Sequence, residues 1–309
     1  MKKRISLGRR AIVLPVLASV LFGGTPASAA ETTTVAGMTP QVSGGSVRIA
    51  QLSAPAQQLL NSGNAKYQRQ DYRGAIADYN QVIKLAPDSA FAYYNRGQAQ
   101  RKLKADKRAV EDYTAAIQRN PKYTRAYFNR GVLRGDMKDY SGAIADYNQV
   151  LKLDPRHADA YFNRGNIRRY QRKYRAALAD YNKSIQLDST AYETYINRGI
   201  IYARLKQYKR AISDFNQSMQ LNPESAKPYY NRAQSYASLK RHKQALADCN
   251  RAIQRNPEYA KAHGLRGVSY FRLGNRSRAL VDLRKAKTFA TQQGDRAYAR
   301  LINRLLQRL

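Results

Sequence analysis

Residues 124–157 read TRAYFNRGVLRGDMKDYSGAIADYNQVLKLDPRH, and residues 158–191 read ADAYFNRGNIRRYQRKYRAALADYNKSIQLDSTA. Both stretches contain Asn-Arg-Gly and then Ala-Asp-Tyr-Asn at the same offsets. Prolines extend this period of 34 residues in both directions, at Pro87, Pro121, Pro155, Pro223 and Pro257, with Ser189 in the remaining place. The period predicts seven repeats after residue 55: 56–89, 90–123, 124–157, 158–191, 192–225, 226–259 and 260–293.

Each repeat has the pattern of two helices. Position 8 is Gly in six repeats and Ala233 in the sixth, position 20 is always Ala, and position 24 is mostly aromatic. Positions 4, 8 and 11 share one face of a first helix, and positions 20, 24 and 27 share one face of a second. Small residues allow the two helices to approach, and the proline at position 32 ends the second. Each pair exposes an apolar face that a neighbouring repeat must cover.

This pattern resembles the tetratricopeptide repeat (TPR), in the form found in exported bacterial proteins. The resemblance implies an all-α fold, a right-handed TPR superhelix (α-solenoid) of seven helix-turn-helix repeats. Residues 294–309 are expected to form a capping helix, because apolar residues share one face of it and Arg296, Arg300, Arg304 and Arg308 mark the other.

Residues 1–29 have the features of an export signal. A basic start precedes a short apolar run and the sequence Ala27-Ser28-Ala29, which is typical of a signal peptidase site. Residues 30–55 are rich in Thr, Ser, Gly and Ala and are predicted to be a flexible linker. We expect export to the periplasm or the outside of the cell, or to a thylakoid lumen, by the general secretory or the twin-arginine route.

Composition argues against an enzyme. The 309 residues include 55 Lys and Arg against 21 Asp and Glu, a formal charge of +34, and removal of the five cations of residues 1–29 leaves +29. A single Cys, three His and the lack of nucleotide-binding or hydrolase motifs predict no catalytic residues, no metal and no cofactor. Cys249 takes the core position 24, so we expect an inert buried thiol.

Two polar positions are expected to be structural, because they recur beside the apolar faces. We predict partly buried ion pairs, within a repeat or between neighbours, between the Asp of position 23 and the Arg of position 7. The aspartates are Asp78, Asp112, Asp146, Asp180, Asp214, Asp248 and Asp282, and the arginines are Arg96, Arg130, Arg164, Arg198, Arg232 and Arg266.

Position 6 is expected to face the concave channel of the superhelix. It is Asn in six repeats: Asn61, Asn95, Asn129, Asn163, Asn197 and Asn231. Side-chain amides in a row can each bind a peptide unit, as the similar asparagine ladder of the O-linked N-acetylglucosamine transferase does. The predicted channel also holds Arg101, Lys102, Arg125, Arg169, Arg204, Lys227, Lys261 and Arg272, against Asp136, Asp159 and Glu193.

Three functions fit these features. The first is an exported, non-enzymatic scaffold that binds extended, acidic peptide segments or partner proteins in its basic groove. The second is a binder of anionic envelope polymer or lipid headgroups, and the third is nucleic-acid binding, which the export signal disfavours. We expect a monomer with no transmembrane span in the mature chain.

Overall fold

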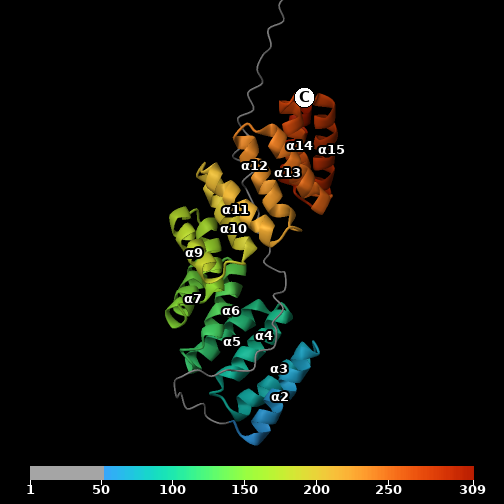
Figure 1. The fold of residues 1–309 in the computed structure, drawn as a ribbon. Coiled ribbons are helices and arrows are strands. Elements are labelled where there is room, and N and C mark those ends of the chain that lie inside the picture. Colours follow the sequence, from blue (N-terminus) through green and yellow to red (C-terminus); the bar gives the residue numbers. More distant parts are fainter. Residues whose placement is uncertain (1–51) are drawn as a thin grey trace, which may run out of the picture. The chain divides into compact units, whose positions relative to one another are not determined.

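The computed structural model describes residues 52–309, and every regular element of this part of the chain is an α-helix (Figure 1). The predicted signal peptide, 1–29, and nearly all of the predicted linker, 30–55, lie outside the described residues. The described chain divides into two compact units, 52–189 and Thr190–Leu309. Among residues 52–309, no helix is both long and apolar enough to cross a bilayer.

The unit of residues 52–189 holds four helical hairpins, α2–α3, α4–α5, α6–α7 and α8–α9. Its helices are α2 (Ala54–Gln68), α3 (Tyr72–Leu85), α4 (Ala90–Lys102), α5 (Asp106–Arg119), α6 (Thr124–Asp136), α7 (Tyr140–Leu153), α8 (Ala158–Tyr170) and α9 (Tyr174–Leu187). Helix α4 begins at the first residue of the second predicted repeat. Helix α2 begins two residues before the first, because Pro55 is well tolerated in a first helical turn, where its missing N–H needs no partner.

The unit Thr190–Leu309 holds three hairpins and a last helix. Its helices are α10 (Tyr192–Arg204), α11 (Tyr208–Leu221), α12 (Ala226–Ser238), α13 (His242–Arg255), α14 (Ala260–Arg272), α15 (Arg276–Gln292) and α16 (Arg296–Arg308). The predicted capping helix corresponds to α16, whose first turn is capped by the side chain of Asp295. Tyr298, Leu301, Ile302 and Leu305 of α16 are buried against α14 and α15.

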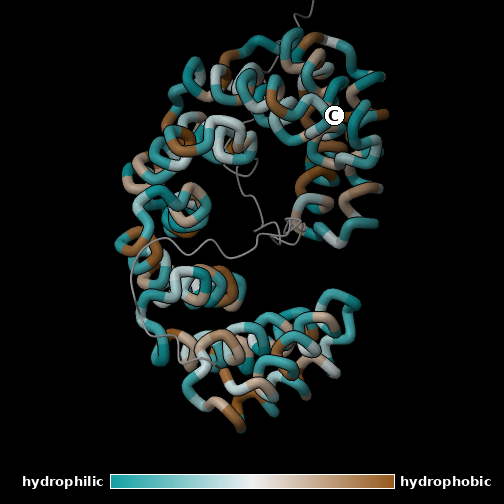
Figure 2. The backbone as a smooth tube through the Cα atoms, turned by 60° about the horizontal axis from the view of Figure 1, so that its bottom comes forward, coloured by the Kyte–Doolittle hydropathy of each residue, from teal (hydrophilic) through white to brown (hydrophobic). Residues whose placement is uncertain are grey.

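The expected all-α architecture of repeated hairpins is confirmed. Apolar positions recur among hydrophilic ones along each hairpin (Figure 2). In both units the second helix of a repeat also packs on the first helix of the next, as α3 does on α4 and α13 on α14. Alanine at position 20 is fully buried in every repeat, which explains its invariance.

Glycine at position 8 is required by the ring at position 24 of the same repeat. A Cβ atom on Gly199 would lie 2.7 Å from Cε1 of Phe215, and one on Gly63 would lie 2.6 Å from Cε1 of Tyr79. The sixth repeat departs from this rule at both places, with Ala233 on the first helix and Cys249 on the second, both fully buried. The smaller side chain at position 24 leaves room for the methyl group, so packing volume is conserved within the hairpin.

We expect Gly199→Ala to destabilise the protein by about 1–2 kcal/mol, because Phe215 is fully buried and must shift to admit a methyl group. Gly135→Ala is the matched control, since its Cβ would meet only Cδ1 of Ile167, at 3.7 Å. The control is expected to be neutral or stabilising by up to about 1 kcal/mol. Urea unfolding of both variants checks this; equal stabilities would contradict the packing account.

Candidate functional site

The first helices of the hairpins line one face of each unit. In the unit of residues 52–189, α2 contacts α4 and α6 contacts α8; in Thr190–Leu309, α12 contacts both α10 and α14. We call this surface the first-helix face. It carries the predicted ligand-binding positions, and the polar contacts beneath it decide how firmly they are held.

Each arginine at position 7 pairs with the aspartate at position 23 of its own repeat, so the predicted pairing is within repeats. In all six pairs an Nη2 atom lies 2.6–2.7 Å from Oδ1 and Nε also donates to the carboxylate. The pairs are Arg96–Asp112, Arg130–Asp146, Arg164–Asp180, Arg198–Asp214, Arg232–Asp248 and Arg266–Asp282. The planar guanidinium therefore makes two parallel bonds to a buried carboxylate.

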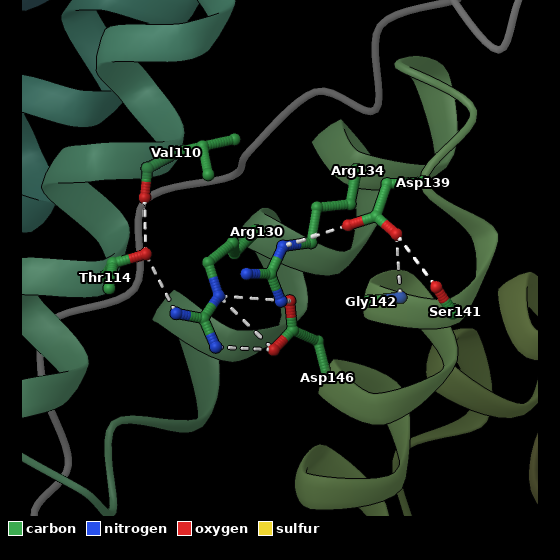
Figure 3. A network of polar contacts seen from close by, with 8 residues as sticks. All are labelled: Val110, Thr114, Arg130, Arg134, Asp139, Ser141, Gly142 and Asp146. Carbon is green, nitrogen blue, oxygen red and sulfur yellow. Dashed lines mark hydrogen bonds and ion pairs between the residues drawn. The ribbon is translucent and has the colours of Figure 1, made fainter.

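The same guanidinium also reaches the preceding repeat, at position 25. Nη1 of Arg130 donates to Oγ1 of Thr114 at 2.9 Å, and the hydroxyl of Thr114 donates to the carbonyl of Val110 at 2.7 Å (Figure 3). Arginines of four other repeats donate to an asparagine Oδ1 at this position: Asn80, Asn148, Asn216 and Asn250. One side chain thus connects three helices of two repeats.

A further cation at position 11, one helical turn after position 7, reaches the same carboxylate in three repeats. Lys66, Arg134 and Arg168 lie 2.8–2.9 Å from Asp78, Asp146 and Asp180. The first repeat has Ser62 in place of the arginine, and there Lys66 and Ser62 together satisfy Asp78. Their bonds lower the pKa of Asp78, although its burial acts in the opposite direction more strongly than any single bond. These contacts were not predicted from the sequence, although the basic residues at position 11, one helical turn after position 7, would have indicated them.

Two of the asparagines at position 6 connect adjacent first helices. Nδ2 of Asn95 donates to Oδ1 of Asn64 at 3.0 Å, and Nδ2 of Asn129 donates to the hydroxyl of Tyr94 at 2.9 Å. Asn129 also donates to Oε1 of Gln98 at 3.3 Å. Asn64 and Gln98 both occupy position 9 of the preceding repeat, so a polar residue there engages the asparagine amide.

Where position 9 of the preceding repeat is apolar, the asparagine turns to its own helix. Position 9 is Val132 in the repeat before Asn163, and it is Ile200 in the repeat before Asn231. Asn163 and Asn231 donate instead to the backbone carbonyls four residues earlier, at 3.0 Å. Asn61 is exposed and accepts a bond from Gln57, and Asn197 is half-buried on α10. The six asparagines therefore lie on first helices but differ in what holds them.

The hydroxyl groups of core tyrosines reach the same face. Tyr79 donates to Asn64 at 2.9 Å, and Tyr181 donates to Oδ1 of Asn166 at 2.7 Å. Burial raises the pKa of Tyr181 to about 12, and the nearby positive charge of Arg169 opposes that shift. In these two repeats the hydroxyl group of the tyrosine at position 24 therefore orients the asparagine side chain at position 9.

The predicted channel cations differ in their surroundings. Arg125 and Lys227 are exposed, and no carboxylate of the described chain lies within 4.0 Å of either. Arg101 lies 3.9 Å from Asp136, and Lys261 lies 3.9 Å from Asp295, so both are partly neutralised. Arg169 and Arg204 are half-buried at the ends of α8 and α10. Lys102 and Arg272, at position 13, are exposed as well. Exposed positive charge therefore lies at positions 2 and 13, while position 2 of the fourth and fifth repeats carries the exposed acids Asp159 and Glu193.

His157, His263 and Cys249 make contacts that stabilise the fold. Nδ1 of His157 caps α8, and His263 is buried between Asp282 and the carbonyl of Pro257. Burial raises the pKa of the Cys249 thiol, which keeps it protonated. Among residues 52–309, no three His, Cys, Asp or Glu side chains are grouped so that they could hold a metal ion.

Comparison with protein families agrees with this architecture. A model described as "TPR repeat" matches residues 63–104 and 136–169, and one described as "Tetratricopeptide repeat" matches 90–123, 158–190, 192–225 and 226–259. Together these ranges cover more than half of the chain. The chain belongs to the tetratricopeptide repeat family.

Solved TPR structures resemble this TPR protein. A tetratricopeptide repeat protein from Parabacteroides merdae is 21% identical with a TM-score of 0.61, over 82% of this chain and 98% of that one. YrrB, described as a TPR protein with an unusual peptide-binding site, is 25% identical with a TM-score of 0.51, over 63% of this chain and 99% of its own. MamA is 25% identical with a TM-score of 0.50, over 56% and 94%. No curated protein matches this chain in sequence.

We expect Asp146→Asn to lower the free energy of unfolding by about 3 kcal/mol, because it leaves Arg130 and Arg134 without a buried counter-charge. Asp139→Asn is the control from the same network (Figure 3), since Asp139 is exposed and Asn caps a helix equally well. Urea unfolding distinguishes the two variants. A stability of Asp146→Asn equal to that of the control would refute the structural role, as would a loss of ligand affinity without a loss of stability.

Proposed function

We propose that this TPR protein is an exported, non-enzymatic scaffold that binds extended acidic peptide segments of partner proteins on its first-helix face. TPR repeats support a role in protein–protein interaction, and the basic, apolar and small-residue pattern of residues 1–29 supports export. The observation that carries the proposal is the row of asparagine amides at position 6, with the exposed cations Arg125 and Lys227 beside two of them.

The contacts of the asparagines favour two of them as ligand-binding residues. Asn163 and Asn231 use Nδ2 only for a local bond to their own helix, which a peptide carbonyl can replace at small cost. Asn95 and Asn129 instead connect neighbouring first helices, so releasing them for a ligand would break a contact between repeats. We infer that peptide units bind chiefly at Asn163 and Asn231.

Charge on the same face favours acidic ligands. Arg125 and Lys227 sit at position 2, one helical turn before Asn129 and Asn231. Lys227 is exposed, and its carbonyl is the acceptor of the Asn231 amide, so cation and amide share one turn of α12. An acidic side chain on a bound peptide would meet the ammonium group while its backbone meets the amide. YrrB, which is similar to this chain, is described as having a peptide-binding site, which supports the assignment to a peptide ligand.

We expect the double variant Asn163→Ala/Asn231→Ala to bind a labelled peptide of alternating Glu and Gly about thirtyfold more weakly than the native chain, at about 1 kcal/mol per lost hydrogen bond. Fluorescence anisotropy measures this. The control is Asn61→Ala, an exposed asparagine of the first repeat whose side chain accepts a bond from Gln57 of its own helix. Peptide affinity unchanged in the double variant would contradict the proposal.

The electrostatic part has its own test. The variant Arg125→Gln/Lys227→Gln is expected to weaken binding of the same peptide by roughly three- to tenfold at low salt, since each exposed ion pair contributes about 0.3–0.7 kcal/mol. The difference from the native chain should shrink at high salt. Lys209→Gln/Lys243→Gln removes the same charge away from this face and should leave peptide affinity unchanged. An affinity insensitive to salt would exclude the role of charge.

A further inference from the structure

The unit Thr190–Leu309 has a strongly basic edge where first helices turn into second helices. We define the turn edge as residues 205–210, 239–243 and 272–278. It contains nine exposed cations and no acidic residue: Lys206, Lys209, Arg210, Lys240, Arg241, Lys243, Arg272, Arg276 and Arg278. None of these lies within 4.0 Å of a carboxylate in the described part of the chain.

The three turns lie beside one another, because they follow α10, α12 and α14, and α12 contacts both of the other helices. His242, in the second turn, has its pKa lowered first by burial and then by the positive charge of Arg272, which belongs to the third turn. The corresponding turns of the unit of residues 52–189 carry Asp71, Asp106, Asp136 and Asp139 among their cations. The turn of the fourth repeat carries Arg172, Lys173 and Arg175 and also lacks an acid, so acids are present in the turns of the first three repeats and absent from those of the last four.

Two of these cations occupy a backbone conformation that suits glycine better. Lys206 and Lys240 follow the ends of α10 and α12 with φ angles of 59° and 60°, in the left-handed region. The equivalent residue of the next repeat is Gly274, with φ of 85° and no atom near its absent side chain. Glycine relieves the steric cost of this conformation. Lysine is therefore present at a local cost to stability.

Helices α11 and α13 of this edge also begin with cations, which are unfavourable at a helix N-terminus. Lys209 and Arg210 lie in the first turn of α11, Lys243 in that of α13, and no acidic residue is present in either turn. Cations are unfavourable near a helix N-terminus, where the backbone N–H groups already carry positive charge. Helices α3 and α7 show the favourable arrangement, with Asp71 and Asp139 accepting from their first turns. The turn edge thus has two locally destabilising features, which are lysines in a left-handed backbone conformation and cations in the first turns of α11 and α13.

Each of the three turns also exposes a leucine directly beside its cations. Leu205 is 42% exposed, Leu239 is 36% exposed and Leu273 is 44% exposed. An acidic polysaccharide or a nucleic-acid backbone offers nothing apolar for such side chains. An anionic bilayer offers both headgroup phosphates for the cations and acyl chains for the leucines.

We propose that the turn edge of Thr190–Leu309 binds the surface of an anionic lipid bilayer, with Leu205, Leu239 and Leu273 entering the acyl boundary and the flanking Lys and Arg residues contacting headgroup phosphates. Apart from Arg272, which ends α14 and was predicted for the channel, the turn edge is separate from the first-helix face, so a membrane-bound scaffold keeps its peptide-binding surface.

The test uses flotation of the full chain with vesicles of phosphatidylcholine and phosphatidylglycerol in equal parts, and with phosphatidylcholine alone. The native protein is expected to bind the anionic vesicles and not the neutral ones. Lys206→Gly/Lys240→Gly should bind about thirtyfold more weakly, because two near-surface cations are lost, yet melt at the same or a higher temperature. Leu205→Ser/Leu239→Ser/Leu273→Ser should weaken binding by about tenfold or more.

The control variant Arg125→Gln/Lys227→Gln removes an equal charge from the first-helix face and is expected to retain vesicle binding. Vesicle binding that this control loses as fully as the lysine variant would overturn the assignment to the turn edge. Binding that the leucine variant retains in full, together with equal binding to DNA or to an acidic polysaccharide, would show a general polyanion site and overturn the lipid assignment.

Discussion

A buried carboxylate in every repeat is the constraint on which this structure depends. The aspartate of position 23 lies between the two helices of its hairpin, where an uncompensated charge would be very costly. Where position 7 is arginine, as in Arg130, the guanidinium removes that cost with two parallel hydrogen bonds, and its remaining nitrogen binds the preceding repeat. In the first repeat Ser62 and Lys66 take this role. A residue that satisfies one hairpin therefore also sets the position of the next.

This arrangement explains how the first-helix face keeps its geometry. In the second to fifth repeats the first helix is held from one side by the guanidinium fork, and its glycine at position 8 allows the ring of position 24 to lie close against it. In the first, second and fourth repeats the tyrosine hydroxyl continues to position 9. Asparagines at position 6 are thus presented on a surface that is already ordered, so the peptide binding that we propose there would require little rearrangement.

Much of this was predictable from the sequence, because it repeats. The 34-residue period predicted the hairpins, and the regular Arg and Asp positions predicted ion pairs beside the core. The partner within the same repeat could not be chosen, since positions 7 and 23 flank the apolar faces in both arrangements. The bonds from the position-7 arginines to position 25 of the preceding repeat were not predicted, because an Asn or Thr on a helix surface does not by itself indicate which residue it binds.

The candidate site was harder to predict, because the contacts of an asparagine depend on a residue of another repeat. Asn129 and Asn163 occupy the same position, yet Gln98 engages the first and Val132 leaves the second to its own backbone. The left-handed conformation at Lys240 follows from the turn geometry and not from its residue type. A single chain shows periodicity well, whereas contacts that differ between repeats become visible only in three dimensions.

Hydrogen exchange of the Arg130→Met variant, measured by mass spectrometry, tests most directly whether one arginine holds two repeats together. The account predicts faster exchange in α6 and α7 and also in α5 of the preceding repeat, where Thr114 loses its partner. Arg125→Met, an exposed residue of the same helix, should change neither region. Faster exchange confined to α6 and α7 would contradict the account, since the guanidinium would then stabilise its own hairpin alone.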